Sequence, residues 1–115
     1  MQNIIVDLIP GYKSPAVCNV SQNDKNRPIE ITLKEQGRRY ELTGEEVLTL
    51  KVRTAAGESI TAEVENPGGD TITIIASQEM TAAQGVNFCK IRIKDKSNTK
   101  DIGAANFKME VEQGI

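Results

Sequence analysis

Residues 47–76, VLTLKVRTAAGESITAEVENPGGDTITIIA, decide the fold of this chain. Their apolar residues alternate with polar ones in three runs, which is the period of strands that bury one face. Two turn signals separate the runs, AAGE at 55–58 and NPGGD at 66–70. In the second, Pro67 presets φ at the first central position of a turn and Gly68 permits a positive φ at the next. The segment therefore predicts a three-stranded meander.

The same alternation recurs on both sides of this segment. It is clearest at residues 29–33, 89–93 and 107–111, where every second residue is apolar. The inward positions of all the runs define a core of modest side chains, which suits a thin fold of two sheets. The predicted core comprises Cys18, Val20, Ile29, Ile31, Leu33, Leu48, Leu50, Val52, Ile60, Val64, Ile72, Ile74, Cys89, Ile91, Ile93, Phe107, Met109 and Val111.

Residues 77–84, SQEMTAAQ, interrupt the alternation. Ser77 can cap a short helix, Glu79 suits its first turn, and Gly85 can end it. Short strands at roughly 8–12-residue spacing with one crossing helix indicate a sandwich. The predicted fold class is all-β: a two-sheet antiparallel, immunoglobulin-like β-sandwich with one short helical crossing near residues 77–84.

The chain length predicts a single domain, because 115 residues can bury one core but cannot divide into two. Within it, residues 1–15 are expected to form an N-terminal strand or arm, and residues 16–115 the sandwich. The arm is apolar on both faces, so it needs cover on both sides. It is either a central strand of this domain or an arm that another subunit covers. The second reading makes its apolar residues a candidate subunit interface: Ile4, Ile5, Val6, Leu8 and Ile9.

Composition restricts the chemistry. The chain has no His and no Trp, its aromatic content is 3%, and its net charge is -2. His-based catalysis, His-ligated metals and aromatic stacking platforms are therefore excluded, and no large field is available to hold nucleic acid or an anionic membrane. No signal peptide is expected, because the first residues lack a basic region followed by an apolar one. We expect no catalytic residue, cofactor or metal.

The two cysteines, Cys18 and Cys89, lie at inward positions of an early and a late strand. Their separation resembles that of an immunoglobulin inter-sheet disulfide, but the Trp that accompanies such bridges is absent. Without a secretion signal, reduced core thiols are favoured over a disulfide.

Three further groups of polar residues are candidate sites. Residues 95–101, DKSNTKD, loosely resemble a calcium loop but lack its Gly and its bidentate Glu, so a solvated hairpin tip is favoured. Glu45 and Glu46 are adjacent in a strand, so they face opposite ways and are interpreted as exposed charges. The third group could form a small basic patch near one end of the sandwich, but it gives only weak support for nucleic-acid binding: Lys25, Arg27, Arg38 and Arg39.

The order of landmarks along the chain resembles a known family. The strongest elements are YELTGEEVLTLKV at 40–52 and QEMTAAQGVNFCKIRI at 78–93, and weaker ones are VSQNDKNRPIEITL at 20–33, TAAGE at 54–58 and GAANFKMEV at 103–111. Together they resemble the N-terminal domain of BppU-type phage baseplate upper proteins, found in tailed phages and prophages of Gram-positive bacteria. The resemblance implies a β-sandwich that attaches to the central hub of the baseplate, with no catalytic residues.

The function implied by this resemblance is that of a structural phage tail protein. It would be an adaptor domain that links the baseplate core to receptor-binding proteins in host adhesion, made in the bacterial cytoplasm and placed in the virion tail. Its expected partners are the central hub and the receptor-binding protein, with a possible homo-oligomer and no nucleic acid or membrane. The alternative is an immunoglobulin-like adhesion or carbohydrate-binding module. Such sites usually need exposed aromatics, and of the four here, Tyr12, Tyr40, Phe88 and Phe107, the two Phe are expected to be structural.

Overall fold

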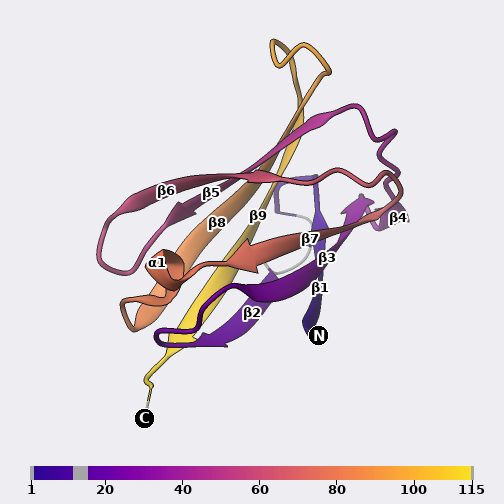
Figure 1. The fold of residues 1–115 in the computed structure, drawn as a ribbon. Helices are drawn as coiled ribbons and strands as arrows, with labels where there is room; N and C mark the ends of the chain where they lie inside the picture. The colour runs from indigo at the N-terminus through magenta and orange to yellow at the C-terminus, as the bar shows by residue number, and fades with distance from the viewer. Residues whose placement is uncertain (1, 12–15, 115) are drawn as a thin grey trace.

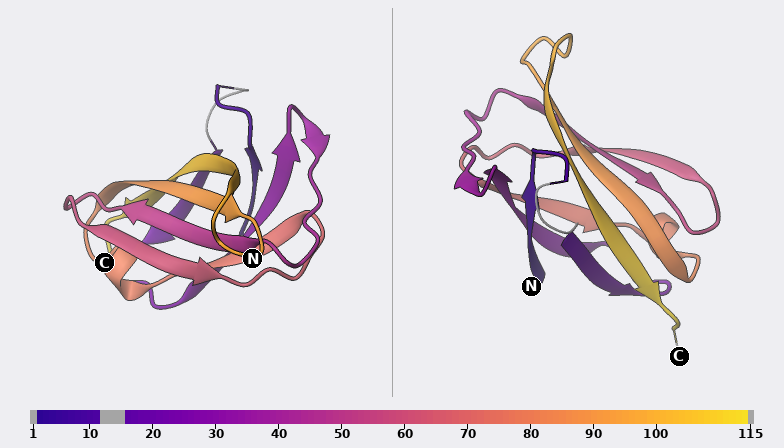
Figure 2. Two further views of the ribbon diagram at one scale, coloured as in Figure 1. Left: turned by 90° about the horizontal axis from the view of Figure 1, so that it is seen from above. Right: turned by 180° about the vertical axis from the view of Figure 1, so that it is seen from behind.

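The computed structural model describes residues 2–11 and 16–114, so part of the predicted arm, Tyr12 included, lies outside the described residues. Two β-sheets pack face to face around one core, as the sequence predicted (Figures 1 and 2). The four-stranded sheet contains β1 (Gln2–Asp7), β3 (Arg27–Glu35), β4 (Arg38–Arg39) and β7 (Thr71–Ala76). The five-stranded sheet has the order β2 (Ala16–Ser21), β9 (Asp101–Glu112), β8 (Gly85–Lys94), β5 (Val47–Arg53) and β6 (Ser59–Val64).

Strand pairing is antiparallel except at two edges. β1 runs parallel to β3, and β2 runs parallel to β9. The β8–β9 hairpin projects from one end of the sandwich, and the described residues at both chain ends lie toward the opposite end (Figures 1 and 2). The molecule is therefore elongated, with principal extents of 41 × 28 × 25 Å.

The predicted meander is wrong in its third strand. β5 and β6 pair as expected, but β7 pairs with β3 in the other sheet. The reason is the loop at residues 66–70. Gly68 and Gly69 both have a φ of 79°, and Gly69 exchanges two backbone hydrogen bonds of 2.8 and 2.9 Å with Leu42. This bridge directs the chain across to the four-stranded sheet instead of back along β6.

The helical crossing forms where it was predicted, as α1 (Gln78–Thr81) between β7 and β8. The Ser77 hydroxyl accepts a hydrogen bond from the backbone N–H of Met80, and Glu79 lies in the first turn. Gly85 does not end this helix, because it begins β8 instead. Its φ is 132°, and a Cβ there would lie 2.8 Å from the Cβ of Ala55, so the position requires glycine.

The predicted core is confirmed except at Ile60 and Val64, which are only half-buried because they lie on the edge strand β6. Seven further residues are buried that the alternation did not predict, at the N-terminus, in connections between strands, and on β7 and β9. They are Ile4, Val6, Leu8, Leu42, Ala76, Met80 and Ala105.

β1 is an edge strand of the four-stranded sheet. Ile4, Val6 and Leu8 face inward and are buried, whereas 56% of Ile5 and 39% of Ile9 is exposed. The side chain of Gln2 joins β1 to β2, since its amide donates to the carbonyl of Asn19 at 2.8 Å and its oxygen accepts from the N–H of the same residue at 2.7 Å. This contact ties the edges of the two sheets together.

Candidate functional site

The two cysteines are free and buried in the same sheet. Cys18 is on β2 and Cys89 on β8, with β9 between them, and the register offsets them by two residues, so their backbones lie roughly 11–12 Å apart. That separation is too large for a disulfide without backbone movement. Burial raises the pKa of Cys18 to about 11 and that of Cys89 to about 12, and the nearby Cys18 thiol adds to the second shift. Neither thiol is set up as a nucleophile.

The hairpin tip at residues 95–100 uses its carboxylate internally. Asp95 Oδ1 accepts hydrogen bonds from the backbone N–H groups of Lys100 at 3.0 Å and Thr99 at 2.8 Å, and Oδ2 accepts one from the Ser97 hydroxyl at 3.1 Å. The bonds from Lys100 and Thr99 lower the pKa of Asp95. Within residues 2–11 and 16–114, no group of three or more His, Cys, Asp or Glu side chains is placed to hold a metal ion.

Glu46 contradicts its interpretation as an exposed charge. Its carboxylate accepts hydrogen bonds from the backbone N–H and the hydroxyl of Thr43 at 3.0 and 2.9 Å, and from the side-chain amide of Asn66 at 3.1 Å. Partial burial alone would raise the pKa of Glu46, but these hydrogen bonds, led by that from the Thr43 N–H, outweigh it and lower the pKa to about 2. Glu46 thus fastens the Leu-Thr-Gly turn to the loop that crosses between the sheets.

The second landmark of the sequence, Met-Thr-Ala-Ala-x-Gly, surrounds a buried amide. Asn87 is fully buried; its Nδ2 donates to the carbonyl of Met80 at 2.7 Å, and its Oδ1 accepts from the N–H of Ala55 at 3.0 Å. The buried Thr81 hydroxyl donates to the carbonyl of Asp24 at 2.7 Å. This junction joins α1 to the β5–β6 turn and to the loop before β3.

The proposed basic patch does not form. Lys25 and Arg27 lie at the start of β3, and Arg38 and Arg39 lie beyond its other end, in β4. Arg27 is paired with Asp24 at 2.7 Å, and Arg39 with Asp70 at 3.0 Å and Glu41 at 3.1 Å. The patch fails because strand β3 separates its two halves.

Side chains that remain available for contact lie on the outer faces of both sheets. On the four-stranded sheet, Ile5 and Ile75 are exposed, and the face between them is polar. There the Asn3 amide donates to Glu30 at 2.9 Å and to the Thr32 hydroxyl at 3.2 Å.

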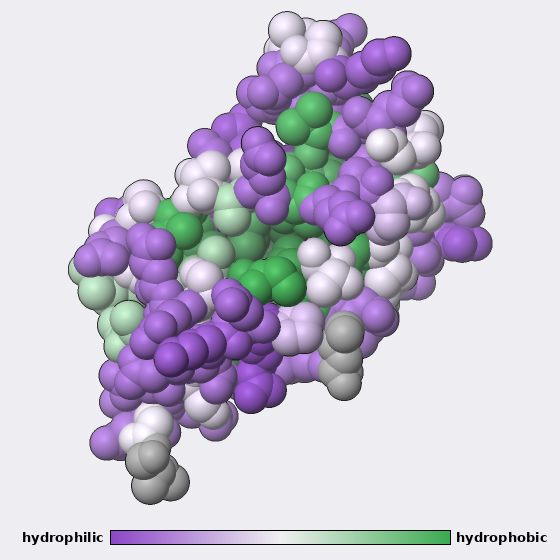
Figure 3. Space-filling model, viewed as in Figure 1, coloured by the Kyte–Doolittle hydropathy of each residue, from purple (hydrophilic) through white to green (hydrophobic). Residues whose placement is uncertain are grey.

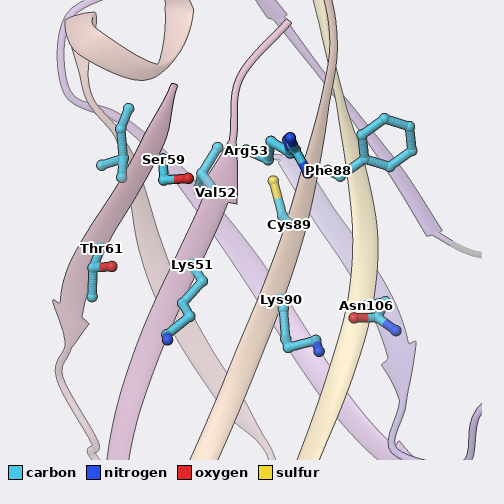
Figure 4. Close-up of a pocket in the computed structure, with 10 residues that line it drawn as sticks. Lys51, Val52, Arg53, Ser59, Thr61, Phe88, Cys89, Lys90 and Asn106 are labelled. Carbon is cyan, nitrogen blue, oxygen red and sulfur yellow. The ribbon is translucent and has the colours of Figure 1, made fainter. Parts of the chain in front are cut away.

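The outer face of the five-stranded sheet combines an exposed aromatic ring with cations. Phe88 on β8, of which 59% is exposed, lies between Arg53 on β5 and Lys108 on β9. The Lys108 ammonium lies 5.8 Å from the centre of the ring. In the next row, Lys90 lies between Lys51 and Asn106, as Figure 4 shows. We call these five residues the Phe88 face: Lys51, Arg53, Phe88, Lys90 and Lys108.

A third surface is the open side of the sandwich between β6 and β7. Apolar residues of both strands line a groove there, with Ala62 and Val64 on one side and Ile74 and Ile75 on the other. In the space-filling view of Figure 3, hydrophobic residues are exposed at the centre of the molecule. None of the three surfaces carries an arrangement of acid, base and nucleophile.

Comparison with known proteins identifies the family. The sequence matches the BppU N-terminal domain family over residues 2–115. The chain belongs to this family. The solved structure of the N-terminal domain of phage TP901-1 ORF48 has the same fold, with a TM-score of 0.73 and 15% sequence identity, and the match covers 96% of this chain and 97% of that one. A search of curated proteins finds no match.

As a BppU N-terminal domain, the chain is a structural component of the phage baseplate, and hence of the virion tail, and it interacts with other baseplate proteins. The family indicates no catalytic activity. Within the part of the chain that the structure describes, no helix is long and apolar enough to cross a membrane.

The Phe88 face of this BppU domain was not predicted from the sequence, because Phe88 was expected to be structural. Only Phe107 is buried. The signal was available: with Cys89 inward, the two-residue period places Phe88 outward and Asn87 inward. The expectation followed residue type, which favours a buried Phe and an exposed Asn, instead of strand register.

Proposed function

We propose that this BppU domain is the adaptor that joins the central hub of the baseplate to the receptor-binding protein during host adhesion. The observation that supports this role is the placement of exposed apolar side chains on opposite sheets. Ile5 lies on the outer face of the four-stranded sheet, and Phe88 on that of the five-stranded sheet. An adaptor needs two separate contact surfaces, and large exposed hydrophobic side chains commonly mark them.

The N-terminal edge is the first of these contacts. Of the candidate interface residues Ile4, Ile5, Val6, Leu8 and Ile9, three contribute to the domain's own core, so Ile5 and Ile9 are those that can reach a neighbouring subunit. β1 also lies at a sheet edge, where a neighbour can add a strand or pack alongside. A second copy of the chain is one such neighbour, which analytical ultracentrifugation of the purified domain would detect as a dimer or larger species.

The adaptor role is tested on purified tails from phage that lack this protein. Mass spectrometry would measure how much hub protein and receptor-binding protein remain on each particle. We expect tails that retain the hub, lose the receptor-binding protein and no longer adsorb to cells. Receptor-binding protein at its normal level on these tails would refute the adaptor role.

The N-terminal contact is tested with the exposed residue and a matched control. Ile5→Ser removes an apolar side chain from the edge strand, and Ile75→Ser removes the same side chain from the other end of the same sheet face. Burial of one Ile side chain contributes about 1.5–3 kcal/mol, so Ile5→Ser should weaken incorporation roughly ten- to a hundredfold. Both variants should melt like the wild type. Equal incorporation of the two would place the contact elsewhere.

A carbohydrate-binding module is the second candidate, and the exposure of Phe88 favours it. Exposed aromatic rings stack on sugar faces, and the hollow beside Phe88 also presents polar groups from Thr61 and Asn106. A glycan array probed with the isolated domain tests it. Selective binding that is lost in Phe88→Ala would support this function, and absence of binding would remove it.

A further inference from the structure

The Phe88 face carries cations that have no carboxylate partner. No ion pair within 4 Å involves Lys51, Arg53, Lys90 or Lys108 among residues 2–11 and 16–114. Among the described residues, three other cations are ion-paired, Arg27, Arg39 and Arg92, the last with Asp101 at 3.1 Å. Although the chain has a net charge of -2, four cations without an ion pair lie close together on this sheet face.

This arrangement is unfavourable for the isolated domain. Lys51 and Lys90 are direct cross-strand partners, and like charges in that position repel each other. Carboxylates of the same sheet face lie one row away on either side, Glu63 beyond the Lys51 row and Glu110 beyond the Phe88 row, and neither reaches the cations. A partner that supplies carboxylates would remove the repulsion.

The exposed aromatic ring of Phe88 is the main apolar group of this face. Phe88 is the most exposed of the large hydrophobic side chains, and Arg53 and Lys108 flank it on the neighbouring strands. An aromatic anchor flanked by a basic group is a common composition of the energetic centre of protein–protein interfaces. The sheet fixes the backbone positions from which the five side chains project, so no backbone ordering is needed on binding.

We propose that the Phe88 face is the docking surface for an acidic segment of another baseplate protein, whose Asp or Glu side chains pair with the lysines while an apolar residue packs on the ring. A protein is favoured over nucleic acid because the face offers one ring and few cations, too little for a row of phosphates and bases. This inference rests on the proposed function only in taking the partner from the baseplate.

Carbodiimide coupling of intact wild-type tails tests the proposal without any variant, because the reagent joins a lysine amine to a carboxylate only when the two are in contact. We expect Lys51, Lys90 or Lys108 to be coupled to Asp or Glu of a different baseplate protein. Lys96, in the loop between β8 and β9, serves as the control. Acetylation should likewise modify Lys51, Lys90 and Lys108 in the free domain but not in intact tails.

Variants then measure the contribution of the face. Phe88→Ala should weaken incorporation about thirtyfold, the size of one truncated hot spot, and Lys90→Glu should weaken it while Lys96→Glu at the hairpin tip does not. Both Phe88 and Lys90 are exposed, so circular dichroism should confirm that the variants fold.

Three results would overturn the inference. They are full reactivity of the three lysines in intact tails, coupling only to a second copy of this chain, and binding of duplex DNA at 150 mM salt that Lys90→Glu abolishes. Each differs from failure of the adaptor role, which is measured by the receptor-binding protein left on tails that lack this chain.

Discussion

Substitution of Asn87 tests whether its two buried hydrogen bonds stabilise the junction between α1 and the β5–β6 turn. Its side chain is fully buried and makes two hydrogen bonds to backbone groups, the carbonyl of Met80 at the end of α1 and the N–H of Ala55 in the β5–β6 turn. Asn87→Ala removes both hydrogen bonds at once and leaves the strand register unchanged. The domain should fold but lose stability.

The size of the loss follows from what is left without a partner. The Met80 carbonyl is buried, and a buried group deprived of its hydrogen bond costs about 1–3 kcal/mol. The Ala55 N–H is only partly buried, so water can replace part of its bond, and the cavity from the truncated side chain adds a smaller amount. We expect a total of about 2–4 kcal/mol, which for a domain of this length lowers the melting temperature by roughly 8–16 °C.

Urea denaturation at pH 7, followed by circular dichroism, measures this loss. Asn106→Ala is the matched control, because Asn106 is exposed on β9 and makes no hydrogen bond through its side chain among the described residues; its loss should stay within about 0.5 kcal/mol. If Asn87→Ala is as stable as Asn106→Ala, the reasoning about this junction is refuted.

A variant of the same shape separates hydrogen bonding from packing. Asn87→Asp keeps the acceptor for Ala55 but turns a negative oxygen toward the Met80 carbonyl, so the buried carboxyl should favour its protonated form and have a raised pKa. The deficit relative to wild type should therefore be large at pH 7 and shrink as the pH falls toward about 3.9, the ordinary pKa of Asp. A deficit that does not change with pH would indicate a steric cause.

Three further outcomes are expected. The folded pKa of Glu46 is about 2 against an ordinary value of 4.5, so the stabilisation by its carboxylate is present above pH 4.5 and is lost as the pH falls toward 2. Glu46→Gln should lower the free energy of unfolding by about 1–2 kcal/mol at pH 7 in urea titrations, a range that allows for solvent screening. The variant should also show a weaker loss of stability in acid. Cys18 and Cys89, with pKa values raised to about 11 and about 12, should not react with a thiol reagent at pH 8 in the native state, and both should react in urea; a missing thiol in urea would indicate a disulfide. Gly85→Ala should lose about 1–3 kcal/mol through its contact with Ala55, more than Gly57→Ala, which also has a positive φ but meets no atom within 4 Å; equal melting temperatures would contradict this.

The sequence predicted the strands better than their partners. Alternation is a local property, so β3, β5, β8 and most of the core could be recognised from it. Pairing depends on distant residues. The loop at residues 66–70 has the composition of a hairpin turn, and only its bridge to Leu42 sends the chain to the other sheet.

Prediction of candidate sites failed where residue type and geometry disagree. Glu46 belongs to a charged residue type that is usually exposed, yet Thr43 and Asn66 surround its carboxylate. Because β1 has apolar residues on both faces, the sequence predicted that both faces are buried. In the structure, only the face of Ile4, Val6 and Leu8 is buried. Whether another subunit covers Ile5 depends on a partner's surface, which this chain's sequence does not encode.

The parallel pairing of β2 with β9 has a consequence for synthesis. β2 is synthesised well before its partner β9, since Ala16 is in register with Phe107. The β8–β9 hairpin joins neighbouring strands, so it can close as soon as both have emerged, whereas closing the β2–β9 loop carries a larger entropy cost. We expect β2 to stay unpaired until β9 has emerged, so the five-stranded sheet is completed late and this edge of the nascent domain is exposed in the meantime.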